Sequence, residues 1–158
     1  IGSNLGDRIV NIEKTKNLIL FNRINILKSS SFYETSSWPN TKLPKYLNIV
    51  LKINTSLSLP NLFLNLKNIE KLIGRIPGPK NSPRVCDIDI IDYNQKNYSL
   101  KINNDFLIVP HPRMSVRNFV LLPLFEICNH WKHPNTKQKI TELMSKLPLS
   151  SITGIKVL

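Results

Sequence analysis

The sequence predicts a mixed α+β sandwich, and three observations favour this fold class. Residues 46–55 alternate apolar with polar side chains, the pattern of a strand with one buried face. Residues 58–73 instead repeat apolar side chains at helical spacing. Strand-like and helix-like segments alternate along the chain, and the strand expected at residues 24–33 is close enough to residues 46–55 to pair with it as a hairpin.

The first half of the chain is expected to contain one helix and two strands. Residues 2–7 are rich in turn formers and helix-capping residues, so we expect a helix over residues 7–21. Residues 24–33 are rich in Ser, Ile and aromatic residues, which favours a strand, and residues 35–44 form a Ser/Pro/Asn loop. In the strand at residues 46–55, Leu47, Ile49, Leu51 and Ile53 form the apolar face, and Tyr46, Asn48, Val50 and Lys52 form the other.

The second half begins with Ser58-Leu59-Pro60, which combines a helix N-cap with a first-turn proline. Gly74 is expected to end that helix. The loop at residues 76–83 contains three prolines, a glycine and a lysine. The later segments are expected as a strand at 85–92, a polar stretch at 94–104, a short apolar segment at 106–109, a buried helix at 118–127 and a short helix at 140–147.

Length and composition exclude several classes of protein. A chain of 158 residues suits one domain and is short for two, so we expect a single domain over residues 1–158. No apolar run approaches the roughly 18–20 residues of a membrane-spanning helix, and the first residues do not resemble a secretory signal. Cys86 and Cys128 fit neither a disulfide framework nor a four-ligand zinc site. We therefore expect free thiols and a cytoplasmic location.

The charge balance points to an acidic partner. The formal net charge is +12, which is typical of proteins that bind nucleic acid, anionic membranes or phosphorylated substrates. The 16 lysines accompany an excess of Ile and Asn and a complete absence of Ala, which indicates that much of the lysine charge is compositional. Four of the six arginines fall in two short segments: they are Arg75, Arg84, Arg113 and Arg117.

The most informative spacing is Asp87-Ile88-Asp89. Residues two apart in a strand share a face, so the two carboxylates are expected side by side, roughly 6.5–7 Å apart at their Cα atoms. Two carboxylates this close repel one another unless a cation lies between them. A hard divalent cation completed by water and phosphate suits such a pair. The alternative is two solvated acids on the open face of an edge strand.

Basic residues surround this pair in the sequence. Arg84 lies three residues before it, and Arg75 opens the loop that leads to it. His111, Arg113 and Arg117 fall within seven residues around two prolines. Guanidinium groups beside a metal–carboxylate pair can hold phosphate oxygens and spread developing charge, as phosphate transfer requires. The alternative is a solvated basic loop.

Other candidate residues are informative only in combination. Tyr46 and Asn48 share one face of a strand and could offer a ring and an amide to a flat heterocycle, or could simply face solvent. Taken alone, Glu70 is a solvated carboxylate on the rim of a helix, and Phe119 is a core residue.

Together these residues resemble the 6-hydroxymethyl-7,8-dihydropterin pyrophosphokinase family of folate biosynthesis. The resemblance runs over nearly the whole chain in unbroken order, and its most specific part is the P-R-x-x-D-[IL]-D-[IL] segment followed by PHPR-x₃-R-x-F. The matching segments are residues 2–7, 31–35, 46–48, 69–70, 74–75, 83–90, 110–114, 117–121 and 123–124.

The resemblance implies a ferredoxin-like α/β sandwich, with an antiparallel-rich mixed sheet and helices packed on one or both faces. It implies transfer of diphosphate from ATP, the co-substrate, to the hydroxymethyl group of the pterin, with release of AMP. Two Mg²⁺ ions are expected as cofactors. The expected partners are these small molecules, with no nucleic acid and no membrane, and the protein is expected to be a monomer.

The resemblance also assigns roles by position. Asp87 and Asp89 match the ligands of the magnesium ions. Arg75 and Arg84 match catalytic arginines, Arg75 being the one on a mobile loop that closes over the reactants. The positions that match ATP-binding residues are Glu70, Arg84, His111 and Arg117. On the pterin side, Tyr46 and Phe119 match residues that sandwich the ring, Asn48 one that hydrogen-bonds its edge, and Thr35 one on the loop that contacts it.

Three departures from the family pattern stand out. Only Ile1 precedes Gly2, where the family has a complete first strand, so this strand is expected to be truncated. The loop at residues 76–83 carries Pro77, Pro79 and Asn81 where many members have arginine or tryptophan, so lid closure is expected to differ in detail. Ser36-Ser37-Trp38 replaces a proline-rich run beside the pterin.

Three other functions compete with this hypothesis. A nucleic-acid-binding module would explain the charge, but it has no use for paired aspartates, which repel phosphate without a metal. A metal-dependent phosphohydrolase or nucleotidyltransferase would use the same D-x-D but leaves Tyr46, Asn48 and Phe119 unexplained. A catalytically inactive scaffold is the third, if the first strand is truly missing.

Overall fold

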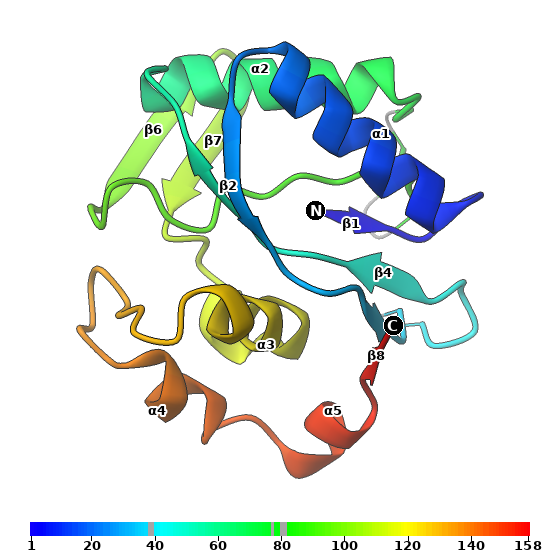
Figure 1. The fold of residues 1–158 in the computed structure, drawn as a ribbon, viewed down its shortest axis with the longest axis vertical. Helices are drawn as coiled ribbons and strands as arrows, with labels where there is room; N and C mark the ends of the chain where they lie inside the picture. Colours follow the sequence, from blue (N-terminus) through cyan, green and yellow to red (C-terminus); the bar gives the residue numbers. More distant parts are fainter. Residues whose placement is uncertain (38–39, 77, 80–81) are drawn as a thin grey trace.

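The computed structural model describes residues 1–37, 40–76, 78–79 and 82–158 (Figure 1). Its elements in chain order are β1 (Gly2–Ser3), α1 (Arg8–Phe21), β2 (Asn25–Ser29), β3 (Tyr33–Thr35), β4 (Tyr46–Asn48), β5 (Leu51–Asn54), α2 (Leu59–Leu72), β6 (Tyr98–Ile102), β7 (Asp105–Val109), the 3₁₀ helix η1 (Met114–Val116), α3 (Asn118–Ile127), α4 (Ile140–Met144), α5 (Leu149–Thr153) and β8 (Lys156–Val157). None of the helices in this described part is long and apolar enough to cross a membrane.

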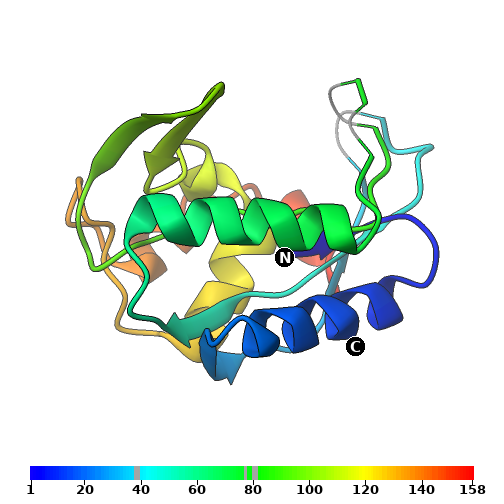
Figure 2. The ribbon, with the colours of Figure 1, turned by 90° about the horizontal axis from the view of Figure 1, so that it is seen from above.

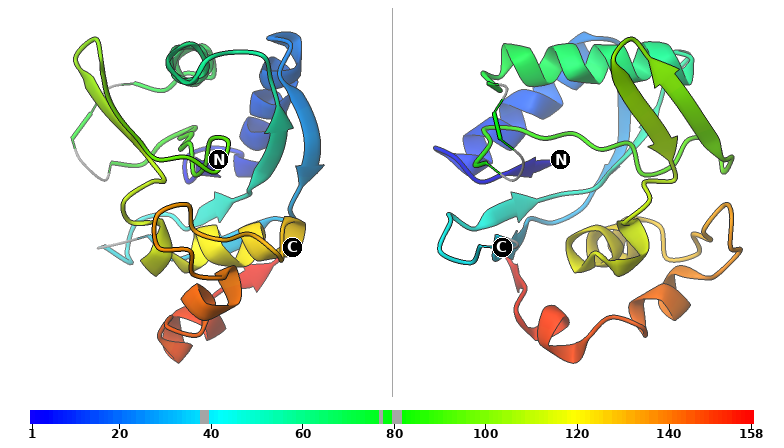
Figure 3. Two further views of the ribbon diagram at one scale, coloured as in Figure 1. Left: turned by 90° about the vertical axis from the view of Figure 1, so that its left-hand side faces the viewer. Right: turned by 180° about the vertical axis from the view of Figure 1, so that it is seen from behind.

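In the described residues the strands form one four-stranded and two two-stranded antiparallel sheets, with helices packed against them, which confirms the predicted α+β class. The main sheet has the order β1-β4-β3-β8, and β2 pairs with β5. Helices α1 and α2 pack against each other above the strands in Figure 1, and α3 contacts β3 and β5 from below. The two rotated views of Figure 3 show the same layers. The sheet was expected to be mixed, yet every strand pair in the described residues is antiparallel.

Local signals set the ends of the first two helices as predicted. The Asp7 carboxylate accepts a hydrogen bond from the Val10 N–H (3.0 Å), which satisfies one of the free donors at the start of α1. Helix α2 has Ser58 at its N-cap and a proline in its first turn. Gly74 follows its C-cap with φ +98°, a left-handed conformation that glycine adopts without strain.

The two long strands predicted at residues 24–33 and 46–55 are each broken in two. At the break, the Ser30 N–H donates to the Val50 carbonyl (3.0 Å), but the Val50 N–H donates to the Ser30 hydroxyl (3.0 Å). A side-chain oxygen thus replaces the backbone carbonyl that a regular ladder would supply. The neighbouring Ile49 turns its N–H and carbonyl to Ile1 (2.9 Å each), so the ladder changes partners here.

The prediction of a strand over residues 85–92 is wrong. Its only pairing in the described residues is a bridge in which Gly2 and Asp87 exchange two hydrogen bonds of 2.9 Å. The next N–H, of Ile88, donates to the Glu70 carboxylate (2.6 Å) instead of to the backbone of a neighbouring strand. The apolar alternation nevertheless holds, because Cys86 and Ile88 are buried in the core between α1 and α2.

The strand β6 lies in the stretch predicted as polar, and it pairs with β7 as a hairpin. The last predicted helix is shorter than expected, ending at Met144, and is followed by α5 and by β8, which adds to the edge of β3. Helix α4 shares one core with η1 and α3, and Ile152 of α5 packs against it. Its buried members are Met114, Val120, Leu121, Leu124, Trp131, Ile140, Leu143 and Leu147.

Candidate active site

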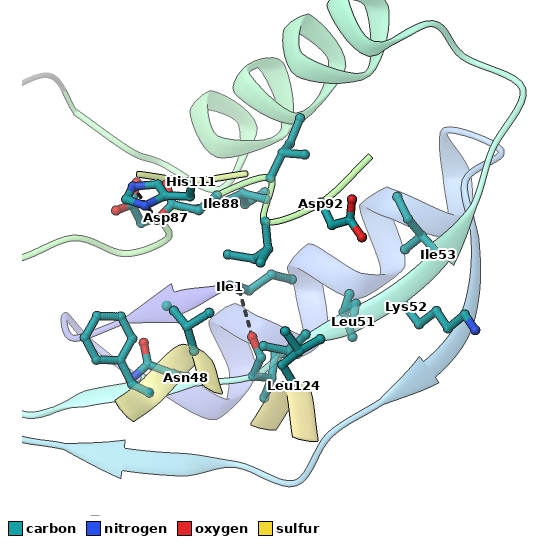
Figure 4. Close-up of a pocket in the computed structure, with 18 of the residues that line it drawn as sticks. Ile1, Asn48, Leu51, Lys52, Ile53, Asp87, Ile88, Asp92, His111 and Leu124 are labelled. Carbon is teal, nitrogen blue, oxygen red and sulfur yellow. Dashed lines mark hydrogen bonds and ion pairs between the residues drawn. The ribbon is translucent and has the colours of Figure 1, made fainter. Parts of the chain in front are cut away.

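A pocket of about 1010 Å³ runs between the strands β4 and β5, the segment after residue 84 and the start of α3. Figure 4 places Asp87 and His111 at one end of it, with Asn48 nearby on the opposite wall, and Asp92 and Ile53 toward the other end. Of the eleven residues to which the resemblance assigns a role, ten line this pocket: Thr35, Tyr46, Asn48, Arg75, Arg84, Asp87, Asp89, His111, Arg117 and Phe119.

Asp87 is held between two arginines. Its Oδ1 lies 3.0 Å from Arg75 Nη1 and its Oδ2 lies 2.8 Å from Arg84 Nη1. The backbone of Asp87 pairs with Gly2, so both its main chain and its carboxylate are held in place. Burial lowers the pKa of the Arg75 guanidinium, but the carboxylates of Asp87 and Glu70 outweigh burial and leave that pKa above its usual value. Arg75 therefore stays charged, and it faces the same acid as Arg84.

Asp89 has its own basic partners on the opposite side of the pocket. Its Oδ2 lies 3.4 Å from Arg117 Nη1 and 3.9 Å from His111 Nε2. Burial lowers the pKa of His111, with a smaller opposing effect from Asp89, so the ring is neutral near pH 7. His111 Nδ1 accepts a hydrogen bond from the Arg113 N–H (3.1 Å), which leaves the ring proton on Nε2, toward Asp89. The two aspartates thus face one cavity through separate sets of donors.

Glu70 lies behind this cluster, because its side chain is buried and does not line the pocket. Its carboxylate accepts hydrogen bonds from Lys67 Nζ (2.9 Å), from Arg75 Nη1 and from the Ile88 N–H. These contacts fix the Arg75 side chain and the backbone between the two aspartates. Glu70 therefore bonds to three residues that line the pocket, Lys67, Arg75 and Ile88, while its own side chain lies behind them. Its role in ATP binding stays a prediction.

The second half of the pocket is a polar and aromatic surface on β3 and β4. Asn48 Nδ2 donates to Thr35 Oγ1 (3.1 Å) and to the Tyr33 carbonyl (3.5 Å), which orients the amide. Thr35 and Asn48 are buried, and burial raises the pKa of Tyr46. Gly2 leaves room for this arrangement, because a β-carbon there would lie 2.9 Å from Asn48 Oδ1.

Phe119 completes this half from the first turn of α3. Its ring packs against the core beneath α3, and the Arg117 guanidinium lies 5.4 Å above the ring centroid. Arg117 thereby contacts both the aromatic half and, through Asp89, the acidic half of the pocket. Burial lowers the pKa of Arg117, with Asp89 opposing it.

The two aspartates fit a magnesium site by the chemistry of their donors. The described residues hold no cluster of three or more His, Cys, Asp or Glu side chains able to bind a metal on their own. Magnesium in phosphate-transfer sites needs only one or two carboxylates, since water and substrate phosphates supply the remaining oxygens. Asp87 and Asp89 meet this requirement, and the surrounding arginines can bind the same phosphates.

Asn4 was not among the predicted site residues; in the sequence it was only one of the turn formers before α1. Its side chain is buried, and its amide bonds to the loop between β3 and β4 and to the backbone of Arg84. The only signal in the sequence was a polar residue directly after a short strand. Trp38, Pro77 and Asn81, which the sequence analysis singled out, lie outside the described residues.

Comparison with known proteins identifies related chains over the whole site. The model of the family described as 7,8-dihydro-6-hydroxymethylpterin-pyrophosphokinase (HPPK) matches residues 1–129. The 2-amino-4-hydroxy-6-hydroxymethyldihydropteridine pyrophosphokinase of Aquifex aeolicus is 38% identical over 143 residues, which cover 90% of this chain and 86% of that protein. The Bacillus subtilis protein of the same name is 38% identical over 129 residues, covering 81% and 75%.

Longer relatives contain the same region as a minor part. The folic acid synthesis protein fol1 of Pneumocystis carinii is 37% identical over 147 residues, and the chain spans only 19% of its length. Among solved structures, an HPPK-DHPS protein crystallised in complex with substrates superimposes with a TM-score of 0.74 at 16% identity. That match covers 99% of this chain and 46% of the other, and at such low identity it supports the fold alone.

Proposed function

Because the chain belongs to the 7,8-dihydro-6-hydroxymethylpterin-pyrophosphokinase family, we propose that it is an ATP-dependent diphosphotransferase of folate biosynthesis. It transfers diphosphate from ATP to the hydroxymethyl group of 6-hydroxymethyl-7,8-dihydropterin and releases AMP. Because the chain spans only a fifth of some relatives, this activity is assigned to the region it covers.

One observation carries the proposal. A single pocket joins two carboxylates that are surrounded by basic side chains to a surface made of a tyrosine, an oriented amide and a phenylalanine. The first half suits a triphosphate with its metal, and the second suits a flat heterocycle with a polar edge. A nucleic-acid-binding surface or a simple phosphohydrolase accounts for only one of the two halves.

Each half has a distinct task in the reaction. The hydroxymethyl oxygen forms a bond to the β-phosphorus and its proton passes to solvent, while the bond from that phosphorus to the α-phosphate oxygen breaks, so AMP leaves. Mg²⁺ bound at Asp87 and Asp89 would neutralise the charge that develops on the phosphate oxygens. Arg84, Arg117 and the Nε2–H of His111 bind and orient the phosphates.

The remaining side chains fix the acceptor and close the site. Asn48, oriented by Thr35, hydrogen-bonds the edge of the pterin, while Tyr46 and Phe119 contact its two faces. Arg75, held by its carboxylate partners at the start of the loop at residues 76–83, closes over the reactants with that loop. Closure excludes water, which would otherwise compete with the hydroxymethyl group for the β-phosphorus.

Four further features belong to the same proposal. Two Mg²⁺ ions bind per site, since each aspartate has its own set of neighbours. Residues 1–158 form one domain, which the shared core beneath α3 supports, and the domain is a monomer. The protein works in the cytoplasm, where its two free cysteines remain reduced. Sedimentation and metal titration in the presence of an ATP analogue test the first two features.

The decisive experiment follows both products. The full chain is incubated with ATP, Mg²⁺ and 6-hydroxymethyl-7,8-dihydropterin, and nucleotides and pterins are separated by chromatography. AMP and the pterin diphosphate are expected in a one-to-one ratio, with no AMP formed when the pterin is omitted. Formation of ADP, or of AMP without pterin, would contradict the proposal.

A further inference from the structure

We propose that Asn4 is a positioning residue that couples the pterin half of the pocket to its nucleotide half, an inference that rests on the proposed function. Asn4 follows β1 directly, and its side chain is buried, with only 1% of the residue exposed. A buried amide must pair both its donor and its acceptor end, so its hydrogen bonds identify the segments that it joins.

The acceptor atom of the Asn4 amide, Oδ1, binds the segment that carries Arg84, in the nucleotide half of the pocket. Asn4 Oδ1 accepts a hydrogen bond from the Arg84 N–H (2.7 Å), and the Asn4 N–H donates to the Arg84 carbonyl (3.0 Å). These two bonds fix the backbone from which the Arg84 guanidinium reaches Asp87 (2.8 Å). The direction of a proposed phosphate-binding arginine therefore depends on Asn4.

The donor atom of the Asn4 amide, Nδ2, binds the loop between Thr35 and Tyr46, in the pterin half of the pocket. Asn4 Nδ2 donates to the Pro44 carbonyl (3.2 Å) and to Ser37 Oγ (3.4 Å), and Ser37 Oγ itself donates to the Pro44 carbonyl (2.5 Å). Ser37 and Pro44 lie near the two ends of the loop that joins Thr35 to Tyr46. One amide thus closes the base of the loop between two residues that are proposed to bind the pterin.

Arg117 and the backbone of Gly2 also touch both halves of the pocket, but in the part of the chain that the structure describes neither bonds to the loop after Thr35, which Asn4 joins to Arg84. Within the described residues, the loop at residues 76–83 makes no hydrogen bond to the rest of the protein. At the start of the loop Arg75 forms an ion pair with Glu70, and just after its end the Arg84 N–H donates a hydrogen bond to Asn4 Oδ1. Figure 2 shows this loop and the loop after Thr35 extending from the same end of the molecule.

This geometry makes binding at the two halves interdependent. A nucleotide that orders Arg84 also fixes the Asn4 amide, which then holds the pterin loop in its binding conformation. A pterin that orders its loop fixes Arg84 by the same route. The coupling is reciprocal by thermodynamic necessity, so each ligand raises the affinity of the protein for the other by the same factor.

The test uses a substitution that breaks only one end of the link. Asn4→Asp keeps an oxygen for the Arg84 N–H but places a second oxygen, in place of the donor, against the Pro44 carbonyl. Asn11→Asp is the matched control, since Asn11 Nδ2 donates to the Leu5 carbonyl (2.8 Å) and contacts neither loop. Both variants replace an amide that donates to a backbone carbonyl with a carboxylate. Because Asn4 is buried and Asn11 is partly exposed, the thermal unfolding of both is measured as well, so that a loss of stability is distinguished from a loss of coupling.

The measurement is the dissociation constant of the pterin with and without saturating Mg²⁺ and α,β-methylene-ATP, whose α–β linkage resists transfer. The ratio of the two constants should exceed 1 for the unmodified protein and for Asn11→Asp. For Asn4→Asp it should fall most of the way to 1, while the affinity for the nucleotide analogue alone stays within about twofold of the unmodified protein. The proposal is overturned if Asn4→Asp has the same ratio as the unmodified protein, or if the ratio of the unmodified protein is itself 1.

A second variant keeps the proposal open to refutation if Asn4→Asp does not fold. Ser37→Ala removes one of the two acceptors of the Asn4 amide and leaves Asn4 in place. It should lower the ratio by at least about twofold, and the unmodified ratio in this variant overturns the proposal. Failure of the unmodified protein to bind the pterin at all contradicts the proposed function instead, so the two failures are distinguishable.

Discussion

Gly2→Ala offers a sharp test of the pterin half of the site. A β-carbon at this position would lie 2.9 Å from Asn48 Oδ1 and 3.5 Å from Tyr46 Cδ1. The Asn48 amide cannot rotate away freely, because its Nδ2 donates to Thr35 Oγ1 (3.1 Å) and to a backbone carbonyl. An ordinary contact therefore requires the amide to move by roughly 0.5 Å.

A displacement of this size should be visible in the kinetics. Misplacing a substrate by about 1 Å can cost a factor of about 100 in rate, so a shift of half that distance is expected to cost about tenfold in kcat/KM for the pterin. That factor corresponds to about 1.4 kcal/mol. The KM for ATP should stay within about twofold. The three atoms nearest to the added β-carbon belong to Asn48 and Tyr46, on the pterin side, and none belongs to a basic side chain.

The assay is steady-state kinetics with either substrate varied, on four proteins: unmodified, Gly2→Ala, Asn48→Ala and the double variant. If alanine acts by displacing the Asn48 amide, it should have little further effect once that amide is gone, so the two losses should not add. Additive losses, or an unchanged kcat/KM for the pterin in Gly2→Ala, would refute the reasoning.

Three other predictions concern the metal, the support behind it and the sheet edge. Asp87→Asn and Asp89→Asn should each lower kcat by at least about 10³-fold, because a metal-binding carboxylate is lost. Thermal unfolding of both should stay near that of the unmodified protein, and near-normal turnover in both would exclude the metal role. Glu70→Ala should cost about 1–3 kcal/mol in urea unfolding, since it leaves a buried N–H without its acceptor, and unmodified stability would contradict this. Burial and a hydrogen bond to a carboxylate raise the pKa of Tyr33 from 10.0 to about 12, so its stabilising contribution is complete below pH 10 and is lost as the pH rises through about 12. Tyr33→Phe should remove that part of the alkaline loss in denaturation curves measured between these pH values, and an unchanged curve would show that Tyr33 contributes nothing there.

The parts of the fold that depend on local chemistry could be predicted from the sequence. Asp7 and Gly74 mark helix ends because capping depends on a few adjacent residues. Leu47 and Ile49 are buried, as the pattern at residues 46–55 predicted, but Asn48 between them is buried as well, so the alternation holds only in part. The spacing of Asp87 and Asp89 placed both carboxylates in one pocket even though no regular strand forms there.

The predictions that failed concern contacts between residues distant in the sequence. The break in the two long strands arises because the Ser30 hydroxyl takes the place of a backbone carbonyl opposite Val50, which no local pattern reveals. Glu70 looked like a rim carboxylate until the fold brought the Ile88 N–H against it. Asn4 became informative only once two loops, about 35–80 positions further along the chain, were found on its amide.

The central claim is that this pocket moves two phosphates together from ATP to a pterin. The most direct test labels ATP separately at the α, β and γ phosphorus and asks where each label is found after reaction with 6-hydroxymethyl-7,8-dihydropterin and Mg²⁺. We expect the β and γ labels both to appear in the pterin product and the α label to remain in AMP. A pterin that carries only the γ label, with the other two in ADP, would contradict the central claim.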